Sequence, residues 1–303
     1  MPRSLCQITD FTTQEIHSIL DLCAKMKTGK IAPRPLEGKS AACIFLKESL
    51  RTRVSFEVGI SQLGGNPIYI TDKEIKLGQR ETVADAARVL SRYVGLIMIR
   101  TFAQSDVEEL AKYAAVPVVN GLTDLVHPCQ ILGDYFTVHE HLGKRERYSI
   151  AYLGDGNNVT NSWLNLACRV PLDLRIGTSG DTLPDKAILA KAKASSFSKV
   201  TITDDPKVAA RGADVLYTDV WASMGQKHLA EEKTSKLKKF QINSALLEEA
   251  GPGAIVMHCL PRWRWAVPTM KPRWPPRRKT TAFNPSSEWF RIRCTRILTR
   301  PLR

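Results

Sequence analysis

The 303-residue sequence has no run of about 18 apolar residues, so it predicts no transmembrane helix and no membrane partner. Its first residues, MPRSLCQITDFTTQE, lack the apolar segment of a secretory signal peptide. The seven cysteines are scattered and form no CxxC pair, which argues against a disulfide framework and against a zinc finger. Together these absences predict a protein of the reducing cytoplasm.

The composition is that of an ordinary globular protein. Hydrophobic residues make up 43% of the chain and charged residues 24%, which argues against wholesale disorder. At roughly 150 residues per domain, the length predicts two domains with cores of their own.

The formal charge of +14 is concentrated at one end of the chain. Residues 262–303 hold twelve Lys or Arg and one acidic residue, Glu288, so this stretch carries +11 and leaves +3 for the rest. The same stretch holds four of the six Trp and six of the 17 Pro. The basic character therefore belongs to residues 263–303, the tail, and does not by itself predict a nucleic-acid partner for the protein.

Short apolar segments alternate with segments of helical periodicity before the tail, which is typical of parallel sheets covered on both faces. The fold class predicted is α/β, with two doubly wound domains. The polar segment Gly143–Arg147 is the best domain boundary, so the domains predicted are 1–142 and 143–262. The predicted strands are Ala41–Leu46, Pro67–Ile70, Leu96–Ile99, Val116–Val119, Ser149–Leu153, Leu172–Ile176, Val200–Thr203, Val215–Tyr217 and Ile255–Met257. The predicted helices of the first domain are 12–26, Thr52–Leu63, Val83–Tyr93, Ser105–Ala114 and Pro128–Leu142.

Unusual polar residues follow several of these strands, where doubly wound sheets bind their ligands. The first strand leads into Lys47–Arg53 and then a helix, so hydroxyls, guanidinium groups and backbone N–H groups meet at a helix N-terminus. This arrangement suits a phosphate-like anion. An ordinary helix cap with solvated arginines explains the segment equally well.

Other strand ends carry candidate residues of the same kind. Arg100 ends one strand, while His127 and Gln130 lie one turn apart at a helix start and can share one carbonyl oxygen. A lone histidine is more often structural than functional, so both interpretations of His127 stay open. The turn GDGNN, which contains Asn158, lacks the third glycine of a dinucleotide-binding motif. Asp219 and Cys259 follow two later strands.

Four ordered motifs carry a family resemblance: SLRTR at residues 49–53, HPCQ at 127–130, DVWASMG at 219–225 and HCLP at 258–261. From about residue 5 to Arg262 the chain resembles the ornithine carbamoyltransferases of the aspartate/ornithine carbamoyltransferase superfamily. The resemblance implies that carbamoyl phosphate and L-ornithine react to give L-citrulline and phosphate, in arginine biosynthesis. It also implies a homotrimer and a site in the cleft between the two domains, with no metal or other cofactor.

The resemblance assigns roles to residues at both predicted half-sites. Phosphate and carbamoyl contacts are implied for Ser49, the Leu50 backbone, Arg51, Thr52, Lys76, Arg100, His127 and Gln130. Ornithine contacts are implied for Asn158, Asp219, Ser223, Met224, Cys259 and Leu260. The catalytic set comprises Arg100, His127 and Cys259, and the general base is left unassigned.

Two departures from the family pattern concern single residues. Leu50 stands where relatives usually have Thr or Gly, and Lys76 where they often carry Gln or His. The larger departure follows Arg262, where the acidic stretch, the E-N-R segment and the final helix of the family are absent. The abrupt shift to Arg, Trp and Pro predicts a disordered or non-native tail, and we hypothesise a frameshift with lower activity as its consequence.

Alternatives remain at this level. Another carbamoyltransferase, acting on putrescine or acetylornithine, is compatible with the motifs, because one loop change can switch the amine acceptor. An impaired paralogue is the second alternative. Its basic tail, with interleaved aromatic residues, would bind RNA or single-stranded DNA.

Overall fold

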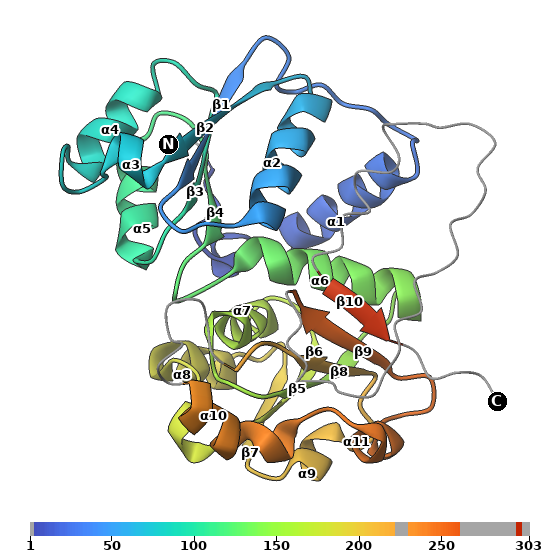
Figure 1. Cartoon of the computed structure of the whole chain (residues 1–303). Coiled ribbons are helices and arrows are strands. Elements are labelled where there is room, and N and C mark those ends of the chain that lie inside the picture. The colour runs from blue at the N-terminus through green and yellow to red at the C-terminus, as the bar shows by residue number, and fades with distance from the viewer. Residues whose placement is uncertain (1–2, 222–229, 261–294, 299–303) are drawn as a thin grey trace. The chain divides into compact units, whose positions relative to one another are not determined.

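The computed structural model describes residues 3–221, 230–260 and 295–298. These residues fall into two compact units, 3–132 and 133–260 with 295–298, and each unit contains one sheet (Figure 1). Two parallel sheets flanked by helices confirm the predicted fold class. No helix in the described ranges is long and apolar enough to cross a bilayer.

The first unit is built on a four-stranded parallel sheet with the order β2-β1-β3-β4. Its strands are β1 (Ser40–Phe45), β2 (Asn66–Thr71), β3 (Leu96–Arg100) and β4 (Val118–Leu122). Its helices are α1 (Thr13–Lys27), α2 (Leu50–Gln62), α3 (Asp72–Ile75), α4 (Val83–Leu90), α5 (Gln104–Tyr113) and the start of α6 (Pro128–Leu142), with a 3-10 turn at Ile8–Asp10.

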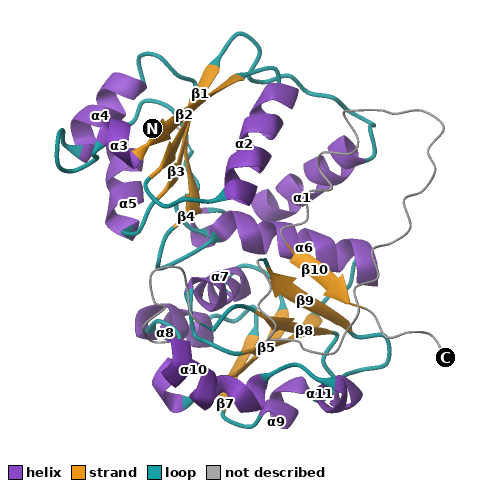
Figure 2. Cartoon of the chain, in the orientation of Figure 1, coloured by secondary structure: helices purple, strands orange, loops and turns teal. Residues whose placement is uncertain are grey.

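Alternation along β1 explains why helices cover both faces of this sheet. Ala42 and Ile44 pack with residues of α4 and α5, whereas Cys43 and Phe45 face Ile60 of α2. Side chains of a strand point alternately to opposite faces, so a strand apolar at every position must be covered twice. Figure 2 shows α4 and α5 on one face and α2 on the other.

The second unit has a six-stranded sheet with the order β10-β9-β8-β5-β6-β7. Its parallel strands are β5 (Tyr148–Leu153), β6 (Leu172–Gly177), β7 (Lys199–Thr203), β8 (Val215–Thr218) and β9 (Ile255–Cys259). Its helices are α7 (Asn158–Ala167), α8 (Lys186–Ala194), α9 (Pro206–Ala210), α10 (Ala230–Leu237) and α11 (Ser244–Glu249), with 3-10 turns at Gly180–Thr182 and Lys238–Phe240.

The two faces of this second sheet are covered by different kinds of side chain. Ala151 and Leu153 of β5 pack with aliphatic residues of α9, α10 and α11. On the other face Trp163 of α7 meets the ring of Tyr217 edge-on, with 5.5 Å between centroids. Tyr217 in turn stacks on Tyr152, at 5.8 Å. The aromatic face lies beside the candidate site residues described below.

Several features differ from the sequence prediction. The strand predicted at Val116–Val119 runs instead from Val118 to Leu122. Pro117 has no N–H for the ladder, and the edge of β4 is paired by the N-terminal segment, since the Asn120 N–H donates to the Leu5 carbonyl at 2.8 Å. The two compact units divide at 132/133, inside the continuous helix α6, because Tyr135 and His139 of that helix pack on Tyr148 of β5, and the domain boundary at 142/143 stays a prediction.

A further difference lies in the tail. Residues Thr295–Leu298 form β10, which pairs antiparallel with β9 at the edge of the second sheet (Figure 1). The sequence predicted a disordered or non-native tail with no strand in it. A four-residue edge strand far from its partner in the chain leaves no local periodicity by which to recognise it.

Each sheet has one point at which the chain reverses its direction of strand addition. In the first sheet β1 is followed by β2 on one side and then by β3 on the other. In the second sheet β5, β6 and β7 add one way, and β8 returns to the other side of β5. Open α/β sheets bind ligands at the carboxyl ends of the strands at such switch points. The β1/β3 and β5/β8 ends are therefore where a site is expected.

Candidate active site

The first half-site forms where α2 begins, directly beyond β1. Ser49 is the N-cap residue of α2, and its Oγ accepts a hydrogen bond from the Thr52 backbone N–H at 3.3 Å. The same hydroxyl donates to Thr52 Oγ1 at 3.0 Å. The start of α2 thus lies two residues earlier than predicted, which brings the whole SLRTR segment into the cap and first turn. Backbone N–H groups of a first turn lack helical acceptors and can bind an anion.

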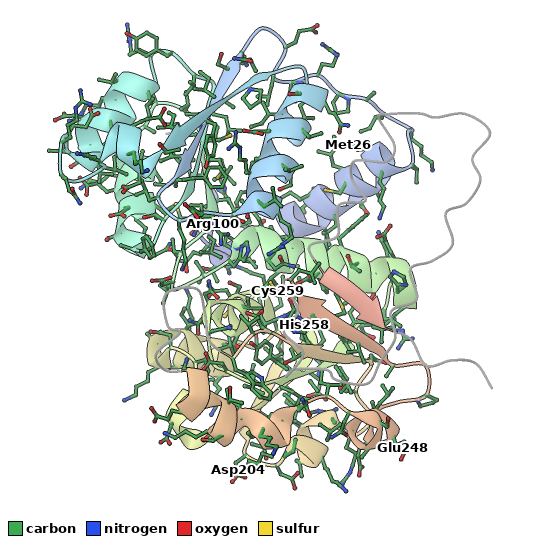
Figure 3. All side chains as sticks on the ribbon, in the orientation of Figure 1. Met26, Arg100, Asp204, Glu248, His258 and Cys259 are labelled. Atoms are coloured by element: carbon green, nitrogen blue, oxygen red, sulfur yellow. The ribbon has the colours of Figure 1, made fainter. Side chains whose placement is uncertain are left out.

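Arg100 joins this helix start from the neighbouring strand. It ends β3, opposite Phe45 of β1 in the ladder, and its Nη1 donates to Thr52 Oγ1 at 3.2 Å. Both side chains are buried. A buried guanidinium is retained where an anion or carbonyl oxygen needs its donors. Figure 3 shows Arg100 at the carboxyl end of β3.

The two arginines of the SLRTR segment lie in different surroundings. Arg53 Nε donates to Glu57 at 2.9 Å, one turn along α2, and the guanidinium stacks on the Tyr69 ring at 3.7 Å. Arg53 therefore stabilises the helix and β2. The half-buried Arg51 lies one position after Leu50 in the first turn. The exposed Leu50 side chain leaves its backbone N–H at the first helical position.

His127 and Gln130 complete the group of donors at this end of the sheet. Burial lowers the pKa of His127 to about 3, and the positive charges of Arg100 and Lys47 lower it in the same direction. His127 is therefore a neutral imidazole at physiological pH, with one nitrogen to donate. Gln130 is buried in the first turn of α6.

Lys47 also belongs to this cationic group, although it was not among the predicted site residues. It is buried, its Nζ is 2.7 Å from Asp124 Oδ1, and it also lies 4.9 Å from the centre of the Phe102 ring. Its position directly after β1 was the available signal, but a lysine at a strand end is common on protein surfaces. Lys47 adds positive charge to the half-site and anchors the β4–α6 connection through Asp124.

Lys76 does not join the group in the part of the chain that the structure describes. It is exposed, ends α3 in the left-handed region with a φ of 43°, and turns the chain toward α4. No described contact links it to Thr52 or Arg100.

The second half-site forms where α7 begins, directly beyond β5. Asn157 caps α7, because its Oδ1 accepts from the backbone N–H groups of Val159 at 2.9 Å and Thr160 at 3.3 Å. Its Nδ2 donates to Asp219 Oδ2 at 2.9 Å, across the switch point from β5 to β8. Asn158, the predicted residue, occupies the first position of α7 and is half-buried.

Gly156 lets the turn before α7 pass close to a neighbouring segment. Its N–H donates to the Thr182 carbonyl at 2.8 Å, and a Cβ on this residue would lie 2.3 Å from the Pro184 nitrogen. Only glycine fits this approach. The GDGNN turn is therefore shaped by packing against residues 182–184.

Asp219 is the electrostatic centre of the second half-site. Burial raises its pKa to about 7, with further upward contributions from the Asp155 and Asp134 carboxylates. Hydrogen bonds from the Val220 N–H and the Asn157 amide lower the pKa. A buried carboxylate that ionises near neutrality favours a cationic partner, such as an ammonium group.

Cys259 and Leu260 lie at the carboxyl end of β9, beside β8. Cys259 is buried and Leu260 half-buried, and the His258 ring contacts the Cys259 carbonyl oxygen through Nδ1. Figure 3 shows His258 and Cys259 together on this strand.

Comparison with known proteins agrees with this arrangement. Two family models match: the aspartate/ornithine carbamoyltransferase carbamoyl-P binding domain over residues 3–140, and the Asp/Orn binding domain over residues 146–266. The chain belongs to the aspartate/ornithine carbamoyltransferase family. The resemblance noted in the four sequence motifs is thereby confirmed.

Two relatives show how far this family likeness extends. The ornithine carbamoyltransferase of Syntrophus aciditrophicus strain SB is 46% identical over 267 residues, which cover 87% of this chain and 88% of that protein. The chloroplastic ornithine carbamoyltransferase of Pisum sativum is 47% identical over 266 residues, covering 86% of this chain and 71% of that protein.

Solved structures of the family have the same fold. The ornithine carbamoyltransferase from Pyrococcus furiosus superposes with a TM-score of 0.83 at 40% identity, covering 96% of this chain and 94% of that one. The anabolic enzyme from Campylobacter jejuni gives a TM-score of 0.83 at 33% identity, covering 88% of this chain and 89% of that one.

Within this carbamoyltransferase, the structure brings the sequence-selected residues into two groups. Hydrogen bonds join Ser49, Thr52 and Arg100, and the positive charge of Arg100 lowers the pKa of His127. Ser223 and Met224 lie outside the described residues. Both Asn of the turn are candidates from the sequence, but only Asn158 was among the predicted site residues, because the bond from Asn157 to Asp219 depends on a partner 62 residues away.

Proposed function

We propose that this chain is an ornithine carbamoyltransferase, which transfers the carbamoyl group of carbamoyl phosphate to L-ornithine and releases L-citrulline and phosphate. The observation that carries the proposal is the buried Arg100 bonded to Thr52 at the capped start of α2. It combines fixed positive charge with N-terminal helix amides at a switch point, which suits a phosphate group. The names of the relatives support the same reaction.

The first half-site is proposed to hold carbamoyl phosphate. Ser49, Arg51, Thr52 and the Leu50 N–H would bind the phosphate, and Lys76 would reach the site of a neighbouring subunit in the proposed trimer. The carbamoyl oxygen would accept hydrogen bonds from Arg100, His127 and Gln130. A neutral His127 suits this role better than an imidazolium, because burying a neutral ring does not carry the cost of burying a charge.

The second half-site is proposed to hold ornithine through Asn158, Asp219, Ser223, Met224, Cys259 and Leu260. The Asp219 carboxylate is suited to an ammonium group, which would lower the pKa of Asp219 by pairing with it. Its hydrogen bond from Asn157 fixes the direction of the carboxylate before the substrate arrives.

In the proposed reaction, the neutral δ-amine attacks the carbamoyl carbon and forms the new C–N bond. Negative charge grows on the carbamoyl oxygen and then on the departing phosphate oxygen as its C–O bond breaks. Arg100 and His127 would stabilise the first charge and the α2 start the second, as an oxyanion hole does. The attacking nitrogen loses one proton, which the departing phosphate can accept, and no covalent enzyme intermediate is required of Cys259.

We further propose the arrangement and setting that the family resemblance implies. Residues 1–142 would bind carbamoyl phosphate and 143–262 ornithine, in line with the descriptions of the two family models. The active form would be a cytoplasmic homotrimer in arginine biosynthesis. Residues 263–303 would be a non-native replacement of the family C-terminus, as their Arg, Trp and Pro content indicates. Reading the coding DNA in its other two frames beyond codon 262 tests this, since one frame should yield an E-N-R segment.

The test of function is a citrulline assay with ornithine, run beside putrescine and acetylornithine as acceptors. We expect product with ornithine and at least tenfold less with the other two amines. Calorimetry with carbamoyl phosphate should give binding heat that Arg100→Met abolishes. A chain that binds carbamoyl phosphate yet carbamoylates none of the three amines would contradict the proposed reaction.

A further inference from the structure

A lysine outside the family motifs reaches into the second half-site. Lys233 Nζ on α10 is 2.7 Å from Asp155 Oδ2 in the turn between β5 and α7. The exposed fraction is 20% for the lysine side chain and 6% for the aspartate. An ion pair this far from solvent is not screened as surface pairs are, and removing one partner leaves a buried charge uncompensated.

Asp155 is connected to the residue that orients Asp219. Its backbone carbonyl accepts hydrogen bonds from the Asn157 N–H and from Thr160 Oγ1, both at 2.9 Å. Asn157 in turn donates to Asp219 at 2.9 Å. The geometry is a continuous series from Lys233 through Asp155 and Asn157 to the Asp219 carboxylate.

Asp219 lies among other acidic groups, so the pairing of Asp155 with Lys233 affects the charge around it. The carboxylates of Asp155 and Asp134 both raise the pKa of Asp219. Tyr217, whose hydroxyl donates to Asp134 at 2.6 Å, and Tyr152 are held neutral because burial raises their pKa values well above the usual range. The titratable or charged groups around Asp219 are Tyr152 of β5, Asp155 of the turn, Asp134 of α6, Tyr217 of β8 and Cys259 of β9, and Lys233 of α10 is paired with Asp155. Lys233 is the one cation in this described set.

We propose that Lys233 is a positioning residue for the ornithine half-site. Its ammonium neutralises Asp155, so that the turn holds Asn157 in place and Asp219 can ionise and accept an ammonium group of the substrate. This inference rests on the proposed ornithine function.

The test compares four variants of the full-length chain, and a fifth that serves as a rescue, with the wild type. Lys233→Met removes the cation, Asp155→Asn removes the anion, and the double variant removes both. Lys236→Met is the matched control, because Lys236 lies on the same helix and pairs only with Glu232 and Asp181 among the contacts given by the structure, at 2.8 and 2.9 Å. The measurement is the pH profile of kcat/KM for ornithine at saturating carbamoyl phosphate.

The two single variants should move the acidic limb of this profile in opposite directions. Loss of a nearby cation raises a carboxyl pKa, so Lys233→Met should shift the limb upward by roughly one unit. Loss of a nearby anion lowers the pKa, so Asp155→Asn should shift the limb downward. The double variant should return close to the wild-type limb. Lys233→Met should also raise KM for ornithine about tenfold, leave carbamoyl phosphate binding unchanged and be rescued by Lys233→Arg.

A purely structural role for Lys233 would lower activity in both single variants with no opposed shift, and that result would overturn the proposal. Should a variant be inactive, titration of the ¹³C-labelled Asp219 carboxyl, assigned with Asp219→Asn, gives the same comparison without turnover. If the wild type forms no citrulline, the proposed function fails. If it forms citrulline but the limbs do not separate, only the role of Lys233 fails.

Discussion

Replacing Asp219 with Asn should make the protein more stable while it destroys the ornithine half-site. Burial raises the pKa of Asp219 from 3.8 to about 7, so the folded state holds this proton more tightly than the unfolded chain does. The folded state therefore loses stability as the pH rises from about 4 to 7 and stays at the lower level above that. A rise of one in the pKa corresponds to about 1.4 kcal/mol, so the loss of unfolding free energy at pH 8 is at most about 4 kcal/mol.

Asparagine has nearly the same shape as the carboxylic acid and does not ionise. Its Oδ1 can still accept the hydrogen bond that Asn157 donates to Asp219, so the cap of α7 should be kept. We expect Asp219→Asn to exceed the wild type in unfolding free energy by about 2–4 kcal/mol at pH 8, and by no more than about 1 kcal/mol at pH 4.5, where most of the ionisation cost is absent.

Urea unfolding followed by tryptophan fluorescence, at one protein concentration and at both pH values, measures this difference. Asp204→Asn is a suitable control, because that side chain is 83% exposed and its change should alter stability by less than about 0.5 kcal/mol. In parallel, ornithine turnover by Asp219→Asn should fall at least 100-fold. A variant that is less stable than the wild type by the same amount at both pH values would refute the reasoning.

Three further changes have defined outcomes. Gly156→Ala should lower the unfolding free energy by about 1–3 kcal/mol, because its Cβ would meet backbone atoms at 2.3–2.4 Å, whereas Gly180→Ala, with nothing within 4 Å, should not. Arg100→Lys keeps the charge but loses the fork of donors that reaches Thr52, so calorimetry should show weaker carbamoyl phosphate binding than the wild type and stronger than Arg100→Met. His127 holds its proton less tightly when folded, so stability is lost as the pH falls below 6.5 toward 3. Urea unfolding at pH 7 and 5 should therefore show His127→Asn losing about 2 kcal/mol less than the wild type.

The strands and the first half-site were largely predictable because their signals are local. A buried parallel strand is an uninterrupted apolar run, and the polar residues after it must lie at the carboxyl edge of the sheet. Arg100 needed nothing more than this rule. The segment at Ser49 left two interpretations open, and the structure shows why: Ser49 is an ordinary helix cap, and the hydrogen bonds of that cap also place Thr52 against Arg100.

The second half-site was less predictable because its contacts are not local. The hydrogen bond from Asn157 to Asp219 spans 62 residues, and the ion pair from Lys233 to Asp155 spans 78. No periodicity relates such positions. The same reason explains the edge strand β10, whose partner β9 precedes it by more than thirty residues of sequence. Strand order, which decides these meetings, depends on the whole chain.

The two half-sites carry opposite charges, although each is built on a capped helix start at a switch point. In the first unit the helix N-terminus is combined with Arg100 and with Lys47, whose charge is partly offset by Asp124, and the arrangement favours an anion. In the second unit the cap residue Asn157 directs its amide at Asp219, and three buried carboxylates outweigh the partial positive charge of α7. In the two proposed half-sites the charge preference therefore comes from the groups around each helix start, Arg100 and Lys47 in one and Asp219, Asp155 and Asp134 in the other.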